Sequence, residues 1–343
     1  MALAILVAGA VNVGHYARNT TVYGSPLGPP ADGGFAYGAE TLAPASIAST
    51  TVRNVALHLG TPSADANAWI ERAVRRGHAA LGLDADDPRV TWFGERFVVP
   101  SWDPEEDYAG NPVHALLIIG AVAIAVVQVR RRPMLAAYAS ALVLGWLLFS
   151  AVLKWQPWHS RLHMPFFVSA SPLVAAVLGR ATIARLGITV ALIVAAIPAV
   201  LWNAHRPLVG PGSVWHHGRG NFYFATADPN EVPAYRGAAE AMQHLGCRDI
   251  GIDMQRGNNL EYLFWVLTRH ARGTSGRIEH IDGEARRLAP VKDFAPCAIV
   301  AWHTPSDTYD YAGVRFGRTW VSEPIGVYTR CEPAGGGCRP TPR

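Results

Sequence analysis

The segment 154–163 concentrates side chains that can bind an anion beside a membrane. Its basic and aromatic residues are Lys154, Trp155, Trp158, His159, Arg161 and His163. Arginine presents a planar fork that bonds phosphate through two hydrogen bonds, and lysine and histidine add positive potential around it. Tryptophan is enriched at membrane–water interfaces. The segment therefore predicts a pocket for an anionic head group, with simple anchoring of the neighbouring helices as the alternative.

A second set of chemically active residues is acidic. Glu106 and Asp107 belong to a run of three carboxylates just before a long apolar run. Either carboxylate could act as a general base toward a hydroxyl group, whereas a solvated loop is the commoner use of such a run. His205, His216 and His217 have no acidic partner at ligand spacing, so we predict no metal site.

The composition of the chain limits the elements that position these residues. The chain has 343 residues, of which 50% are hydrophobic and 16% charged. This is too apolar for a disordered chain and too poor in charge for an ordinary soluble enzyme. The net charge is +4, but no basic stripe interleaved with aromatic residues accompanies it, which argues against a nucleic-acid partner.

Four uncharged runs follow one another closely, at 113–129, 134–153, 164–179 and 186–202. A spanning helix needs roughly 20 mostly apolar residues, with a lower limit near 17. Buried core helices of a soluble protein are the alternative, but such runs leave no polar face toward water. We therefore expect four transmembrane helices over 113–203, and a truncated fifth over 1–15.

Basic residues in the joints predict the orientation of these helices. Arg130, Arg131 and Arg132 fill the first joint, and Arg180 and Arg185 fill the third. Because arginine and lysine are retained on the cytoplasmic side, both joints should be cytoplasmic. The loop region 16–112, the segment 154–163 and everything after 203 then lie outside. We expect a multi-pass protein of the inner (plasma) membrane.

The two aqueous parts differ in pattern. The region 16–112 begins irregularly and contains an amphipathic helix over 66–81, which lies on the membrane surface or on the bundle. The region 204–330 predicts a helix that starts at Pro229, with Asp228 as its N-cap, and ends at Gly246. A second helix follows near 258–271. Strands are expected at 248–254, 277–281 and 298–302, with an antiparallel pair at 315–321 and 325–330.

Strands that alternate with helices favour a parallel sheet. The predicted fold class is an α-helical polytopic membrane protein with a C-terminal extracytoplasmic α/β domain. No glycine-rich nucleotide fingerprint follows a predicted strand, so we predict no cofactor.

All four cysteines fall in the part placed outside, where disulfides persist. Cys331 and Cys338 flank a glycine-rich turn in the tail 331–343, and we predict that they form a disulfide. Cys247 and Cys297 each stand at the entrance of a predicted strand. They are either bridged or two buried free thiols.

Three segments carry a family resemblance: WQPWHSRLHMP at 155–165, RN at 18–19 with YGSPLGP at 23–29, and EDYAGNP at 106–112. They resemble the carboxyl-terminal half of bacterial integral-membrane glycosyltransferases of the GT-C superfamily. The likeness is to the protein O-mannosyltransferase and aminoarabinose transferase type and extends over about residues 12–302.

The resemblance implies transfer of a sugar, with inversion, from a polyprenyl-phosphate donor lipid to an extracytoplasmic glycan, lipid or protein acceptor. Arg161 corresponds to a residue that grips the lipid phosphate. The catalytic aspartate of the family would lie before Met1, so we expect this chain to be a carboxyl-terminal portion. The alternative is a non-catalytic membrane-anchored protein whose outer domain, after residue 203, binds a ligand or partner.

Overall fold

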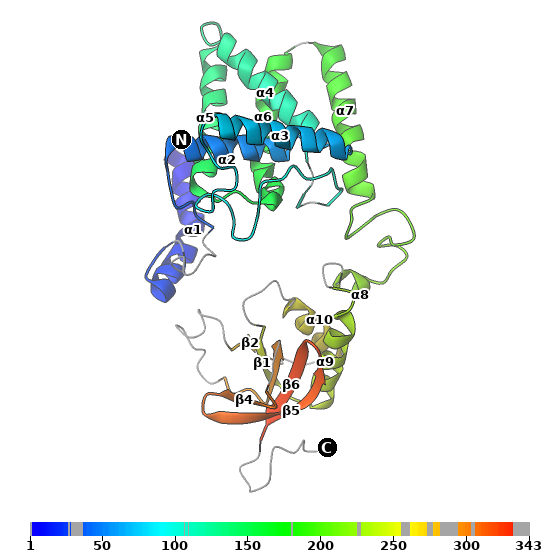
Figure 1. The fold of residues 1–343 in the computed structure, drawn as a ribbon. Helices are drawn as coiled ribbons and strands as arrows, with labels where there is room; N and C mark the ends of the chain where they lie inside the picture. Colours follow the sequence, from blue (N-terminus) through cyan, green and yellow to red (C-terminus); the bar gives the residue numbers. More distant parts are fainter. Residues whose placement is uncertain are drawn as a thin grey trace. The chain divides into compact units, whose positions relative to one another are not determined.

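We describe residues 2–26, 28, 37–105, 107–108, 110–179, 181–224, 228–254, 261–272, 277–281, 294–302 and 306–331 of a computed structural model (Figure 1). The chain divides into two compact units. One unit is Ala31–Gly218, and the other combines Met1–Pro30 with Arg219–Arg343.

The unit Ala31–Gly218 is helical. Its elements are α2 (Pro44–Leu57), α3 (Ala64–Ala80), α4 (Pro112–Val127), α5 (Pro133–Val152), the 3-10 helix η1 (Pro157–His163), α6 (Met164–Leu178) and α7 (Thr182–Leu201). Prolines stand in the first turns of α2, α4, α5 and α6, where their fixed φ suits the helix and their missing N–H costs no bond.

Three segments of this unit are long and apolar enough to cross a membrane: Pro133–Val152, Pro157–Leu178 and Thr182–Leu201. Three of the four predicted runs are therefore helices of the length and composition that a membrane span needs. The first run, α4, is equally apolar but has 16 residues, because the chain turns at Gln128 before the arginines. It is therefore shorter than the predicted span.

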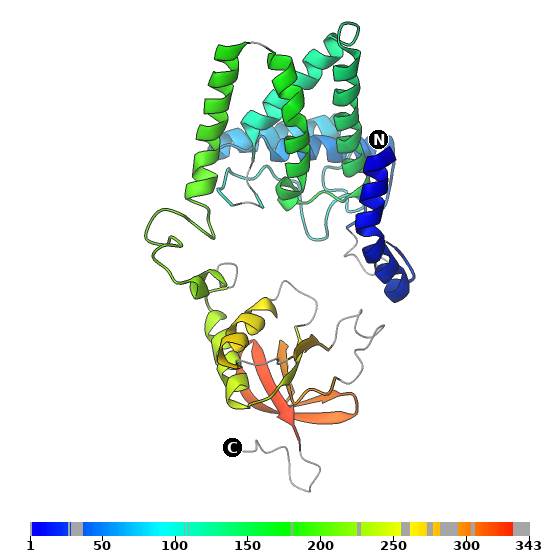
Figure 2. The same ribbon diagram turned by 180° about the vertical axis from the view of Figure 1, so that it is seen from behind.

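Helices α2 and α3 run across α5 and α6 rather than along them, as both Figure 1 and the reverse view in Figure 2 show. The carboxamide of Asn54 in α2 donates a hydrogen bond of 3.1 Å to the hydroxyl of Ser150, in the last turn of α5. The imidazole of His78 in α3 bonds the hydroxyl of Ser49 in α2 at 2.9 Å. The two crossing helices therefore sit at the carboxyl-terminal end of α5.

Helix α1 extends over Ala2–Tyr23, beyond the bounds predicted for the truncated span over 1–15. Its apolar pattern is interrupted at Asn12, His15, Arg18 and Asn19. The truncated span stays a prediction.

The unit that combines Met1–Pro30 with Arg219–Arg343 contains a six-stranded sheet in the order β2-β1-β3-β6-β5-β4. The strands are β1 (Asp249–Asp253), β2 (Arg277–His280), β3 (Ala298–Trp302), β4 (Thr308–Tyr311), β5 (Val314–Ser322) and β6 (Ile325–Arg330). Strand β1 pairs in parallel with β2 and β3, and the remaining pairs are antiparallel. The α/β prediction is confirmed, and β4 is an additional strand.

The helices of this unit are α8 (Arg219–Phe222), α9 (Val232–His244) and α10 (Glu261–Arg272). Helix α9 begins three residues later than predicted. The carboxylate of Asp228 accepts the N–H of Asn230 at 2.9 Å, so it closes a local turn instead of capping a helix. Pro233 then stands in the first turn of α9. Gly246, with φ +61°, ends the helix as expected.

The two faces of the sheet are both covered, since all five residues of β3 are buried. Ile250, Val300 and Val327 pack with Tyr235, Met242 and Phe264 of α9 and α10 on one side. A disulfide joins Cys247 to Cys297, with 5.8 Å between their Cα atoms. It connects the entrances of β1 and β3, and this settles the alternative left open by the sequence.

Candidate functional site

The charged end of the helical unit is built around an ion pair between Arg161 and Asp107. Nη1 of Arg161 donates to both carboxylate oxygens of Asp107, at 3.0 and 3.1 Å. The side chain of Arg161 is 52% exposed. Two residues for which the sequence predicted separate roles are therefore in direct contact.

The acidic segment that carries Asp107 is also attached to the end of α7. The imidazole of His205 lies 3.6 Å from the carboxylate of Glu105, and the carboxamide of Asn203 donates to the carbonyl oxygen of Pro104 at 3.2 Å. Burial raises the pKa of the Tyr108 phenol, and the nearby carboxylates of Glu105 and Asp107 raise it further. Tyr108 therefore stays protonated at neutral pH beside the Arg161–Asp107 pair.

Lys154 is a buried partner of a carboxylate and does not face solvent. Its ammonium group is 2.6 Å from the carboxylate of Glu40, and its side chain is 3% exposed. The backbone N–H of Lys154 donates to the carbonyl oxygen of Tyr37. This residue ties the segment around Glu40 to the end of α5, and its charge is largely balanced there.

His159 and His163 are buried among aromatic rings and polar side chains. Nδ1 of His159 lies 3.1 Å from Oδ1 of Asn54, and Nδ1 of His163 lies 2.9 Å from Nε2 of His58. Because a carboxamide oxygen only accepts, Nδ1 of His159 is the donor in the first contact. Both imidazoles thus bind α2 to η1.

The two tryptophans take different positions. Trp155 is fully buried, with its ring at 5.4 Å from that of Phe97 and under the guanidinium of Arg53 at 5.6 Å. Trp158 is half-buried against Trp92. Of the six predicted binding residues, all of which the structure describes, Arg161 is the one with an exposed side chain. Whether they bind a substrate stays a prediction.

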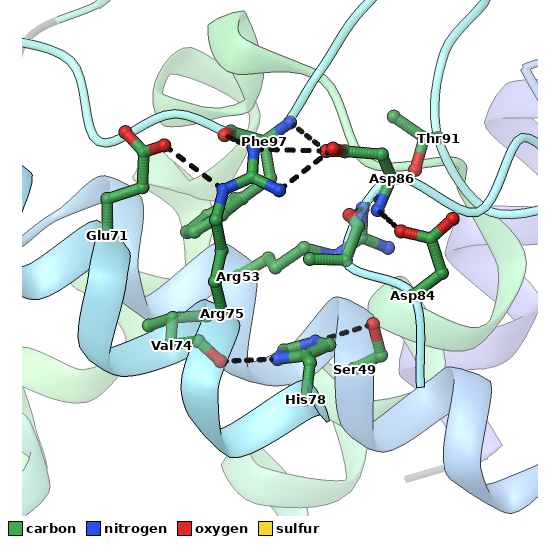
Figure 3. Close-up of polar contacts among 11 residues, drawn as sticks. Ser49, Arg53, Glu71, Val74, Arg75, His78, Asp84, Asp86, Thr91 and Phe97 are labelled. Carbon is green, nitrogen blue, oxygen red and sulfur yellow. Dashed lines mark hydrogen bonds and ion pairs between the residues drawn. The ribbon is translucent and has the colours of Figure 1, made fainter. Parts of the chain in front are cut away.

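Arg53 of α2 and Arg75 of α3 hold the segment 84–97 against these two helices (Figure 3). Arg53 is fully buried and donates to the carbonyl oxygens of Ala85 and Val90 and to the hydroxyls of Thr50 and Thr91. Burial lowers its pKa to about 10, so it remains charged at neutral pH.

Arg75 lies between two carboxylates, 3.1 Å from Glu71 and 2.8 Å from Asp86 (Figure 3). Burial acts to raise the pKa of Asp86, but the hydrogen bonds from Arg75 and from the N–H of Phe97 outweigh it and lower that pKa. The guanidinium of Arg75 is thus bonded to groups of its own unit. We therefore assign Arg75 a structural role and not one in ligand binding.

An apolar cavity of about 230 Å³ lies among α2, α4, α5 and α6. Its walls are aliphatic and aromatic, and they include Val55, Ile118, Leu142, Phe166 and Phe167. Lining residues of α5 and α6 belong to the second half of α5 and the first two turns of α6. The cavity is therefore at the same end of the helices as Arg161.

Three residues that line this cavity carry a buried polar atom with no partner among the described residues. These atoms are Oγ1 of Thr51, Nδ1 of His58 and Nε1 of Trp146. Buried polar atoms without partners are uncommon and often mark a place where water or a ligand binds. The sequence pattern contained no signal for this cavity, because its walls come from four separate helices.

Some predicted residues lie outside the described part of the chain. Glu106 is one of them, so Asp107 is the described candidate for a general base. Cys338 is another, and the Cys331–Cys338 bridge stays a prediction. Among the described residues, no group of three or more His, Cys, Asp or Glu side chains is placed to hold a metal ion.

Comparison of the chain with protein families, with characterised proteins and with solved structures finds no match.

Proposed function

We propose that this chain binds a polyprenyl-phosphate-linked sugar and serves as part of a membrane glycosyltransferase of the GT-C type. The observation that carries the proposal is the position of the apolar cavity, at the same end of the bundle as the exposed guanidinium of Arg161. A lipid-linked sugar needs both features: an apolar wall for the first isoprene units and a cation for the phosphate.

The mostly aliphatic and aromatic lining suits a hydrocarbon chain, because burying apolar surface against it is favourable. Two of the four helices that line the cavity, α5 and α6, belong to segments that are long and apolar enough to cross a bilayer, where a polyprenyl chain would already be dissolved. Only the part of the chain next to the phosphate needs to enter the protein.

Arg161 supplies the charge for the phosphate end. Its Nη1 contacts Asp107, and a guanidinium has five N–H donors, so the remaining donors can bond phosphate oxygens. In the transfer, a hydroxyl of the acceptor attacks the anomeric carbon, the bond from that carbon to the phosphate oxygen breaks, and the phosphate leaves with the electron pair. A cation beside the leaving phosphate stabilises the charge that develops.

The transfer also releases the proton of the acceptor hydroxyl. Asp107 is the described carboxylate paired with Arg161, and it would accept this proton while the other guanidinium donors hold the phosphate.

The proposed topology is multi-pass in the inner membrane, with Arg161 and the α/β part outside the cytoplasm. Arg132 donates to the carbonyl oxygen of Ala176 in the last turn of α6 at 3.2 Å, which brings the first joint beside the third. Arg130, Arg131 and Arg185 add positive charge to these joints, as expected of a cytoplasmic face.

Cysteines introduced singly at Arg131 and at His217 test this topology by labelling with a membrane-impermeant maleimide. Position 131 should be labelled only from the cytoplasmic side, and position 217 only from outside. Labelling of position 217 from the cytoplasm would contradict both the topology and the transferase assignment.

Binding of a polyprenyl-phosphate analogue to the purified full chain tests the proposed function. Arg161→Lys keeps the charge but loses the fork, and Arg161→Ala loses both, so affinity should fall in the order Arg, Lys, Ala. A charge-assisted hydrogen bond contributes about 1.5–3 kcal/mol, which predicts a loss of at least roughly tenfold for Ala.

Two further variants sharpen this test. Asp107→Asn removes the competing carboxylate and should leave binding equal or tighter, while removing the proposed base. Arg89→Ala removes another exposed arginine, paired with Asp87, and should leave affinity unchanged. Equal affinity of the wild-type and Arg161→Ala chains would refute the phosphate role and favour a non-catalytic anchored protein.

A further inference from the structure

The outer face of α3 has no described partner. Trp69, Arg72 and Arg76 are exposed along it, and spacings of three and four residues place them on one side of the helix. Trp69 is 64% exposed, which is unusual for a large apolar side chain. The opposite face is satisfied: Asn67 and His78 are buried, and Ile70 and Val74 pack with Leu57 and Phe97.

The charge of this face comes from Arg72, Arg76 and Asp65. The third arginine of α3, Arg75, is paired with Glu71 and Asp86. Exposed Asp65 lies one turn before Trp69 on the same side of the helix, and no described carboxylate lies within ion-pair distance of Arg72 or Arg76. The face therefore carries two positive charges and one negative charge, a net +1, with both arginines on the carboxyl-terminal side of the exposed tryptophan.

The position of α3 at the end of α5 determines which part of a membrane its outer face could contact. Asn54 joins α2 to the last turn of α5, and His78 joins α3 to α2. Helix α3 thus lies at the end of an apolar helix long enough to cross a membrane, and it runs across that helix (Figures 1 and 2). If α5 crosses the bilayer, α3 lies parallel to the membrane plane, near the level of the lipid head groups.

We propose that this face of α3, with Trp69, Arg72 and Arg76 as its contact residues, binds the head groups of anionic phospholipids. Tryptophan rings favour the head-group level, and an amphipathic helix with arginine at its polar border binds anionic lipid by apolar burial and charge attraction together. The proposal rests on the membrane crossing of α5 and does not depend on sugar transfer.

The contact would have a mechanical effect on the loop. Arg75, on the adjoining side of α3, bonds Asp86 and the carbonyl oxygen of Phe97. Lipid bound to Arg72 and Arg76 would therefore fix the level of the loop region 81–111, which carries Asp107, against the membrane surface.

The test uses the full chain in lipid nanodiscs with an environment-sensitive fluorophore at position 73. Ala73 is exposed between Arg72 and Arg76, so an Ala73→Cys variant reports on this face; Cys331 and Cys338 are replaced by Ala in every sample to keep labelling specific. Discs of phosphatidylcholine alone are compared with discs that contain phosphatidylglycerol, and lipids with a quencher near the head group measure proximity.

We expect a blue shift and stronger quenching in the anionic discs. Each basic residue near an anionic surface contributes about 1 kcal/mol, which is roughly a fivefold change in affinity. Arg72→Gln and Arg76→Gln should each raise the phosphatidylglycerol fraction needed for half-maximal quenching by about that factor. Lys at both positions should restore most of the response, and Arg89→Gln should not alter it.

A probe at position 73 that stays water-exposed and unquenched in both kinds of disc overturns the proposal. The face would then be a candidate for binding a protein partner instead of lipid. A fluorescence response that is equal in neutral and anionic discs also overturns it, because the helix would then enter the membrane through its apolar side chains without any contribution from lipid charge. Labelling of the joints from the two sides of the membrane tests the crossing of α5 separately, so failure of that premise can be told from failure of the lipid contact.

Discussion

His58 and His163 join two segments of different character through one hydrogen bond, with 2.9 Å between Nε2 of His58 and Nδ1 of His163. His58 caps α2, outside the apolar helices, and His163 ends η1 at the start of α6. Both imidazoles are buried, and one must donate while the other accepts. The contact between the end of α2 and the end of η1 therefore depends on the protonation state of these two buried histidines.

The first prediction concerns pH. Burial lowers the pKa of His58 from 6.5 to about 4, and positive charge on His114 contributes less. The unfolded chain takes up this proton near its ordinary pKa while the folded chain does not, so stability is full above about pH 6.5 and falls toward about pH 4. The loss from this group is roughly 3 kcal/mol at most.

Thermal unfolding of the detergent-solubilised chain at several pH values within that window measures the effect. His58→Gln should unfold with a weaker dependence on pH, whereas His244→Gln, an exposed position, should keep the wild-type slope. A wild-type chain whose unfolding temperature rises as the pH falls would show that the sign is wrong.

The second prediction separates the ion pair at the candidate site from the architecture. Arg161 and Asp107 are 52% and 29% exposed, and exposed pairs contribute about 0.2–1 kcal/mol. A double-mutant cycle with Arg161→Ala and Asp107→Ala, read by denaturant unfolding, should give a coupling energy in that range. A coupling of several times this size would mean that the pair anchors the loop.

The third prediction concerns Arg53. Arg53→Met would leave the buried carbonyl oxygen of Ala85 without its described donor, whereas that of Val90 keeps the backbone N–H of Trp155. An unsatisfied buried acceptor costs about 1–3 kcal/mol, so we expect a loss of that size. Arg89→Met, at an exposed pair, should change stability by less than about 0.5 kcal/mol. Equal unfolding midpoints for the two variants would contradict the structural role of Arg53.

The fourth prediction compares two helical glycines. A Cβ atom at Gly237 in α9 would lie 2.5 Å from Cζ2 of Trp320, whereas one at Gly77 in α3 would meet nothing within 4 Å. Gly237→Ala should destabilise the chain by about 1–3 kcal/mol through overpacking. Gly77→Ala should stabilise it by up to about 1 kcal/mol. Unfolding curves that shift in the same direction would refute this comparison.

The fifth prediction concerns the Cys247–Cys297 disulfide. The bridge closes a loop of 50 residues, and the chain-entropy relation gives a stabilisation of about 4 kcal/mol for that length. Replacing both cysteines by alanine should lower the unfolding temperature of the unreduced protein. Peptide mapping without reduction should recover the linked pair, and two alkylatable thiols at these positions would contradict the bridge.

Elements with strong local signals could be predicted from the sequence. The apolar runs, the helix stop at Gly246 and strand β3 at its observed bounds depend on residues close in the chain. Strand β4 was missed because TYDY is a short, polar edge strand. Its pairing with β5 comes from the sheet rather than from its own pattern.

The partners of the candidate site residues could not be predicted, because they are distant in the chain. Lys154 meets Glu40 across 114 residues, and His159 meets Asn54 across 105. A cluster of basic residues indicates charge at one position but not the groups that neutralise it. The basic segment therefore indicated positive charge but not that Arg161 is exposed while Lys154, His159 and His163 are buried.

Asn54 has a consequence for the biogenesis of the protein. Its Nδ2 donates to Ser150 in α5, and its Oδ1 accepts from His159 in η1. One carboxamide thus closes a connection between the end of one apolar helix and the start of the next. Since Asn54 precedes Ser150 by 96 residues and His159 by 105, its carboxamide can be satisfied only after α5 and η1 have been synthesised. A substitution at Asn54 should therefore weaken the attachment of α2 to the end of α5 and leave the apolar helices themselves intact.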